Sequence, residues 1–307
     1  MVTVGLLTFI ILGLLLMFNQ TQRAFRTGMT QTDVLESGRA TMDIMARELE
    51  QMTPSEVPDM LAGNFRYRVT NFFAEPSPGF DWRNPLTQDL PGNVNSIPLR
   101  TNLIQRFYFL SKLNQDWLGT GYEVVPDDTN GCVGTLYRYS ITNYPRGAMF
   151  DTVNFRGGLI DMSGKFRSFV DPTNMSRIAD GIVHLRLRAF ARNGYLLTTN
   201  YVTGTNAAYP VQVNGPYTNL PNAYAYSSAF AFGNNTDLKQ AACYFVSNAL
   251  PGYVELELGI LEPRVLQKYR SIPISTSARD YLSNHVGQVH IFRQRIPVRN
   301  LDLSAYP

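Results

Sequence analysis

The first fifty residues carry two hydrophobic patterns that both belong to a helix. Residues 2–18 are apolar on every side, apart from two threonines and two glycines. From residue 19 to 52 there is no proline, and apolar positions recur at alternating spacings of three and four, as on one face of a helix. Thr53-Pro54 follows, and the residue before a proline avoids helical angles. The pattern therefore predicts one helix of about 50 residues, about 75 Å long, that ends near Met52.

The two halves of this helix have different expected surroundings. The apolar half must be covered by lipid or by a partner, because a helix that is apolar all round is not stable in water. Its residues are Val2, Val4, Leu6, Leu7, Phe9, Ile10, Ile11, Leu12, Leu14, Leu15, Leu16, Met17 and Phe18. The striped half is expected to pack against the domain that follows, through Leu35, Gly38, Met42, Met45, Leu49 and Met52. Thr21 and Gln31 interrupt a heptad traced back along the chain, which disfavours a free coiled coil.

A cleaved secretory signal is disfavoured as an interpretation of the apolar half. Such a signal has basic residues before a short apolar region and small residues at its cleavage site. The first charged residue here is Arg23, and the apolar run ends in MFNQTQRAFR, which offers no site of that kind. The apolar run is therefore expected to stay attached to the helix behind it.

After Pro54 the pattern changes to short runs in which apolar and polar residues alternate, separated by Pro, Gly and Asn. Alternation of this kind predicts half-buried strands of an antiparallel sheet. The predicted strands cover 65–73, 104–111, 135–142, 182–190, 253–261 and 289–296. Two short helices are expected, one after Glu262 beginning with Pro263, and one in STSARDYLSN with a Ser/Thr cap. The fold class is therefore α+β: a long helix packed on a mainly antiparallel head. Residues 193–235, rich in Asn, Tyr and Gly, are expected to form a surface excursion.

Composition and charge narrow the possible partners and chemistry. The net charge of +3 is spread along 307 residues without a basic block, so no nucleic acid partner is expected. The two cysteines, Cys132 and Cys243, could form one disulfide in an oxidising compartment or could be two separate buried thiols.

No motif of an enzyme or of a cofactor site stands out in the chain. His285 and His290 lie five residues apart, which does not match a helical zinc pair, and His290 is expected on a strand surface. Residues 127–131 lack the ligand spacing of an EF-hand calcium loop and are expected to form a polar turn, with a calcium site of another kind as the alternative. There is no phosphate-binding or nucleophile-elbow sequence. We therefore expect no catalytic residues, no metal and no cofactor.

The stretch LESGRATMDIMARELEQM resembles part of a known family. An apolar N-terminal helix that continues into an amphipathic half, followed by a β-rich head, resembles type IV pilins and pseudopilins. The E-x-x-R-x-x-x-x-x-x-A-R-E/D-L run is similar to that of the large minor subunits, the pilin W and type II secretion J groups. In this chain the run consists of Glu36, Arg39, Ala46, Arg47, Glu48 and Leu49. The resemblance divides the chain into a membrane or filament-core half-helix at 1–22, an amphipathic half-helix at 23–53 and a head at 54–307.

The resemblance implies a structural subunit rather than an enzyme. It would be anchored by a single pass in the bacterial inner membrane, with its head in the periplasm, or outside the cell once it is assembled into a filament or its tip. Its partners would be other pilin-like subunits, bound through the N-terminal helix. The alternative is a single-pass anchored binding or adhesin module, with residues 193–235 as its candidate site.

The family signal that precedes the apolar run is not found in this sequence. A basic leader, a cleavage glycine and a glutamate would be expected in front of MVTVGLLTF. Arg23 and Arg26 follow the apolar run and would favour the opposite orientation unless a basic leader outweighs them. We therefore expect Met1 to lie inside a longer reading frame, whose product a prepilin peptidase would process. The alternative is a variant that is not processed, and the upstream DNA distinguishes the two.

Overall fold

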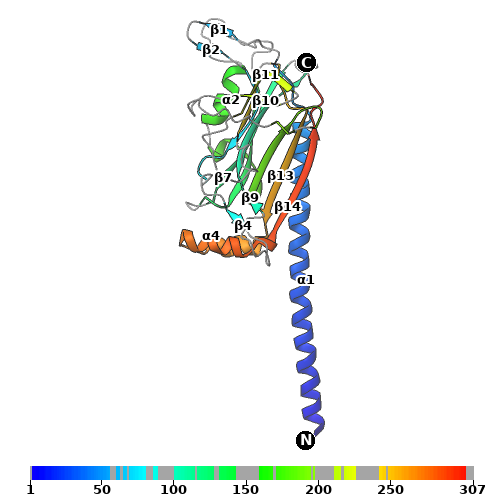
Figure 1. Ribbon diagram of the computed structural model, residues 1–307. Helices are drawn as coiled ribbons and strands as arrows, with labels where there is room; N and C mark the ends of the chain where they lie inside the picture. The colour runs from blue at the N-terminus through cyan, green and yellow to red at the C-terminus, as the bar shows by residue number, and fades with distance from the viewer. Residues whose placement is uncertain are drawn as a thin grey trace.

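The computed structural model combines one long helix with a large antiparallel sheet (Figure 1). The fold is therefore α+β, as the sequence predicts. The described residues are 2–55, 60–62, 65–67, 69–80, 86–88, 100–114, 116–127, 131–142, 159–168, 171–194, 196–197, 211–215, 218–225, 242–246 and 248–301.

The helix α1 (Val2–Leu49) is continuous over 48 residues, and its first half extends beyond the head (Figure 1). It passes through residue 22 without a break. It ends three residues earlier than expected, because the chain after it is already bound to the sheet. Met52 forms an isolated β-bridge with Ser111, and the Thr53 N–H donates to the Leu110 carbonyl at 2.9 Å.

Within the described residues, the main sheet has ten strands in the order β10-β11-β12-β3-β6-β7-β8-β9-β13-β14, and all neighbouring pairs are antiparallel. Its strands are β3 (Thr70–Pro76), β6 (Gln105–Leu113), β7 (Asp116–Pro126), β8 (Gly134–Thr142), β9 (Ser176–Phe190), β10 (Val211–Gly215), β11 (Thr218–Ala225), β12 (Cys243–Val246), β13 (Tyr253–Leu261) and β14 (Val289–Pro297). Two short ribbons pair β1 (Met60–Ala62) with β2 (Phe65–Tyr67), and β4 (Thr87–Gln88) with β5 (Arg100–Thr101).

The sheet curls so that the start of β6 meets the middle of β9. Ile104 and Leu185 form a parallel β-bridge, and the Leu185 N–H donates to the Leu103 carbonyl at 2.9 Å. The Leu187 N–H donates to Oε1 of the buried Gln105 at 2.6 Å. The curl brings the start of β6 against β9, although β7 and β8 lie between them in the strand order.

In the part of the chain that the structure describes, three buried clusters hold the head together. The largest contains residues of α1 from Val34 to Leu49, the docked half of the helix. It joins them to β3, β6 and the β9–β13–β14 end of the sheet. A second packs α2 (Leu159–Ser168) on β3, β6 and β7, with Phe166 at its centre. A third joins α3 (Pro263–Arg270) and α4 (Ser275–Asn284) to the lower end of the sheet. The described residues also include the 3-10 turns η1 (Pro172–Asn174) and η3 (Val286–Gln288).

The structure confirms five of the six strands predicted from alternation, and both short helices. The predicted strand 65–73 is instead divided between β2, which belongs to a separate ribbon, and β3 of the main sheet. The alternation missed β7, because its glycines at 119 and 121 leave room for α2 instead of supplying side chains. A cap by Ser or Thr was wrong for α4: Ile274 occupies the N-cap position, and no side chain bonds there. Part of the expected excursion at 193–235 instead forms β10 and β11 of the main sheet. Most of the rest of that stretch lies outside the described residues.

Candidate functional site: the long helix and its junction with the head

The projecting half of α1 exposes apolar side chains on all sides. Among the described side chains from Leu7 to Phe18, exposure runs from 49% for Ile11 to 81% for Phe9. Further along, Phe25 and Met29 are exposed as well. The side chains of Val2, Val4 and Leu6 lie outside the described residues. A continuous apolar surface of this kind indicates contact with a partner or with lipid.

The hydropathy of the helices gives a separate result. Within the part of the chain that the structure describes, no helix combines the length and the apolarity that crossing a membrane requires.

The docked half of α1 packs against β9, β13 and β14 (Figure 1). Five of the six stripe residues are buried, namely Gly38, Met42, Met45, Leu49 and Met52. Gly38 allows the closest approach, since a Cβ built there would lie 2.2 Å from two ring carbons of Phe292 on β14. The helix and the edge strand are therefore in direct contact at this glycine.

Leu35 was expected on the packed face, and the structure places it on the exposed side. Val34 is buried in its place, 5% exposed. At 100° per residue, Val34 lies nearer than Leu35 to the centre of the face defined by Gly38, Met45 and Leu49. A strict alternation of three and four cannot distinguish these neighbours, because both fall within the apolar arc.

The charged side chain of Glu48 on α1 points at the sheet. Oε2 of Glu48 accepts a hydrogen bond from the Tyr122 hydroxyl at 2.6 Å. Arg138 donates to Glu48 through Nε at 3.0 Å and approaches it through Nη2 at 2.8 Å. This bond raises the pKa of Arg138, and burial raises the pKa of Tyr122. Glu48 follows Met45 by three residues and precedes Met52 by four. This spacing was the sequence signal that Glu48 lies close to the packed face of the helix.

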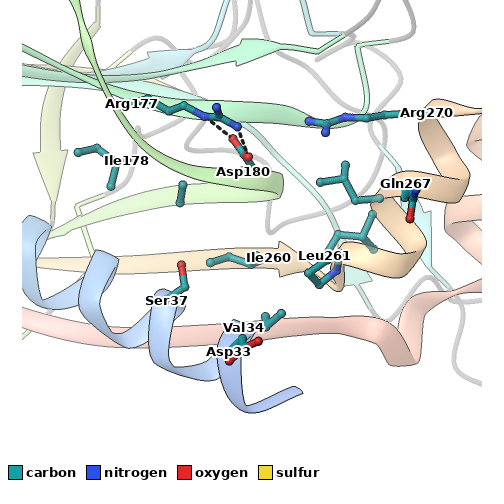
Figure 2. Close-up of a pocket in the computed structure, with 13 residues that line it drawn as sticks. Asp33, Val34, Ser37, Arg177, Ile178, Asp180, Ile260, Leu261, Gln267 and Arg270 are labelled. Atoms are coloured by element: carbon teal, nitrogen blue, oxygen red, sulfur yellow. Dashed lines mark hydrogen bonds and ion pairs between the residues drawn. The ribbon is translucent and has the colours of Figure 1, made fainter. Parts of the chain in front are cut away.

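A cleft of about 760 Å³ lies where α1 leaves the head (Figure 2). Much of its lining is apolar, and Asp33 and Ser37 of α1 lie opposite Arg177 and Arg270 (Figure 2). The full lining is Asp33, Val34, Ser37, Arg177, Ile178, Ala179, Asp180, Ile260, Leu261, Pro263, Leu266, Gln267 and Arg270.

The arginines of the cleft are held by carboxylates. Arg177 forms an ion pair with Asp180 of the same strand, and Arg270 binds Asp127 at 2.5 Å. Thr135 joins the two carboxylates, since its hydroxyl lies 2.8 Å from Oδ1 of Asp127 and 3.1 Å from Oδ1 of Asp180. The described lining is therefore charged but balanced, with Asp33 and Asp180 against Arg177 and Arg270.

The histidines have structural partners. The buried His184 accepts the Leu103 N–H through Nδ1 at 3.0 Å, and its Nε2 lies 3.3 Å from Glu257. His290, on β14, is half-buried beside Glu262 at 3.1 Å. Among the residues that the structure describes, no group of three or more His, Cys, Asp or Glu could hold a metal ion.

No disulfide joins Cys132 and Cys243, and both are thiols. The disulfide that the sequence left open is therefore not formed. Cys132 packs with the α3 and α4 cluster, whereas Cys243 lies on β12 beside Ala74. Two strands, β3 and β6, separate β12 from β7, which leads into the turn that carries Cys132. Strands lie about 4.8 Å apart, so the cysteines exceed the Cα separation that a disulfide tolerates.

Comparison with known proteins found no match for this chain among family models, curated proteins or solved structures.

Proposed function

We propose that this protein is a minor pilin-like or pseudopilin-like subunit. It would be anchored in the inner membrane and assembled into, or at the tip of, a type IV pilus or a type II secretion pseudopilus. The resemblance to the pilin W and type II secretion J groups motivates this proposal.

One observation carries it: a single 48-residue helix is docked on the head along one half and exposes apolar side chains along the other. A simple anchor needs no rigid continuation, because a flexible linker would hold a head at a membrane equally well. Here Glu48 is bonded to two strands, and Gly38 brings α1 against β14. The head therefore fixes the direction in which the apolar half projects, as packing among helices of several subunits requires.

Site-specific photo-crosslinking in the native membrane tests the proposal. A photoreactive residue replaces Leu12 or Leu16, both exposed on the projecting half, and a control replaces Lys268, exposed on α3. We expect adducts with other pilin-like chains from the two helix positions and none from the control. Adducts with lipid alone at both helix positions would exclude subunit packing.

The second candidate is an anchored extracytoplasmic binding module. The cleft between α1 and the head favours it, because apolar clefts of several hundred Å³ commonly hold ligands. Under this alternative, the crosslinking experiment gives lipid adducts only. Substitution of Arg270 by Glu would then change ligand binding without changing how the protein is anchored.

A further inference from the structure

The last three strands of the sheet carry two rows of alternating charge. The pairing register places one residue of each row on β9, one on β13 and one on β14. The rows are Arg186–Glu257–Arg293 and Arg188–Glu255–Arg295. They lie on one face of the sheet, two residues or about 7 Å apart along the strands.

Contacts within and between the two rows tie the central carboxylates to the neighbouring arginines. Arg293 reaches Glu255 at 2.7 Å and Glu257 at 3.2 Å. Arg188 lies 3.2 Å from Glu257 and 3.7 Å from Glu255. The guanidinium group of Arg295 stacks over the ring of Phe190, 4.2 Å from its centroid, and lies 3.9 Å from Glu255. These contacts hold the arginines of β14 over the sheet.

Exposure increases from the centre of each row to its end on β14. The side chains of Glu255 and Glu257 are 7% and 13% exposed. Those of Arg293 and Arg295 are 54% and 48% exposed. Both rows therefore end in an accessible positive group.

The strand that carries these two arginines is at the edge of the sheet. Within the described part of the chain, β14 pairs with β13 alone (Figure 1). The helix α1 covers the opposite face through the contact of Gly38 with Phe292, yet Gln294 on that face is still exposed. An edge strand presents unpaired N–H and C=O groups, to which an extended segment can add as a further strand.

We propose that the open edge of β14 binds an extended, acidic segment of a partner protein by strand addition. Carboxylates at alternate positions of that segment would continue both rows, opposite Arg293 and Arg295. Each row would then read positive, negative, positive, negative across four strands. Opposite charges that face each other on neighbouring strands stabilise a sheet, and like charges destabilise it.

The same pattern argues against a second copy of this chain as the occupant. If two β14 edges paired with their arginine pairs in register, arginine would face arginine. The other edge strand, β10, has the sequence VQVNG and holds no carboxylate. The arginines thus disfavour pairing between copies and select an acidic partner, which is how a charged edge gives specificity.

A peptide-binding experiment with the full chain in detergent tests this inference. The probe is a fluorescent seven-residue peptide with glutamate at positions three and five and valine or threonine elsewhere. Its binding is followed by anisotropy at low salt. One control peptide has lysine in place of both glutamates, and another keeps the glutamates but is N-methylated along the edge that would pair.

We expect the glutamate peptide to bind saturably and both control peptides to bind at least about tenfold more weakly. The double variant Arg293→Gln, Arg295→Gln should bind the glutamate peptide about tenfold more weakly than the parent does, because two cross-strand charge pairs are lost. The matched variant Lys268→Gln, on α3, should bind like the parent.

Three results would overturn the inference. The first is that the glutamate peptide does not bind to the parent protein. This result does not depend on the folding of any variant. The second is equal binding of the N-methylated peptide, which would show that charge attraction holds the peptide without strand pairing. The third is equal binding by a correctly folded double arginine variant.

Discussion

The hydroxyl group of Tyr122 donates a hydrogen bond to Oε2 of Glu48 over 2.6 Å. This bond links a residue near the end of α1 to the middle of β7, and Arg138 of β8 binds the same carboxylate. Glu48 and Arg138 are each only a quarter exposed, so water screens the pair incompletely. The three side chains hold the helix at a fixed position on the sheet.

Removal of the carboxylate should loosen this attachment. We expect Glu48→Ala to lower the free energy of unfolding by about 1–3 kcal/mol, because Arg138 and Tyr122 lose their acceptor in a partly buried place. Denaturant unfolding of the full chain in detergent measures the change. The control is Asp43→Ala on the exposed side of the same helix, which should alter the free energy by less than about 0.5 kcal/mol. Equal effects of the two variants would contradict the assignment.

The contact of Gly38 with β14 predicts opposite effects at two glycines of one helix. Gly38→Ala should destabilise the protein by about 1–3 kcal/mol, because the new methyl group would overlap the ring of Phe292. Gly28→Ala meets nothing within 4 Å and should stabilise the helix by about 0.5–1 kcal/mol. Thermal or denaturant unfolding of both variants checks the signs. If Gly38→Ala stabilised the protein as well, α1 would not approach β14 this closely.

The buried Glu123 should make stability depend on pH. Burial raises the pKa of its carboxyl from 4.5 to about 7, although Arg106 lies 3.6 Å away and opposes the shift. The folded protein therefore keeps a proton that the unfolded chain releases above its ordinary pKa. Unfolding releases this proton between about pH 4.5 and 7, so the contribution of Glu123 to stability falls as the pH rises through that window.

The variant Glu123→Gln removes this contribution. Relative to the parent, the variant should gain up to about 3 kcal/mol of unfolding free energy between pH 4 and pH 8. The difference between the two proteins is the useful quantity, because other groups titrate in both. Unfolding curves at four or five pH values provide it. A constant difference across the range would show that Glu123 titrates normally.

The free thiols of Cys132 and Cys243 predict that no disulfide links them in the purified protein. Under denaturing conditions without reductant, mass spectrometry should find Cys132 and Cys243 unlinked. In the folded chain, burial raises the pKa of the Cys243 thiol from 9.0 to about 12, although a backbone hydrogen bond at Ala74 opposes the shift. The thiolate fraction at pH 8 then falls on the order of 1000-fold. Alkylation of Cys243 in the folded protein should be slower by a comparable factor than alkylation of Cys243 in the unfolded protein. A linked pair of cysteine peptides would contradict the structure.

Local periodicity predicted the long helix and several of the strands, and it was less informative about the contacts between elements. The alternation in YVELELGIL predicted β13, because neighbouring side chains of a strand point to opposite faces. It could not show that Glu255 and Glu257 lie between arginines of two other strands, since that depends on register between distant segments. The strand β7 was missed for a related reason. Its glycines matter only because Phe166 of α2 lies over Gly121, a contact that no local pattern contains.

By itself, the sequence determined that the chain begins with a long helix of two characters and continues into an antiparallel head. Both properties follow from spacings within single elements, which neighbouring residues fix. Only the tertiary structure decided that Val34 rather than Leu35 faces the sheet, that Glu48 binds strands 74 and 90 residues away, and that the two cysteines stay apart. These outcomes depend on where distant segments meet, and the packing of the whole head fixes that.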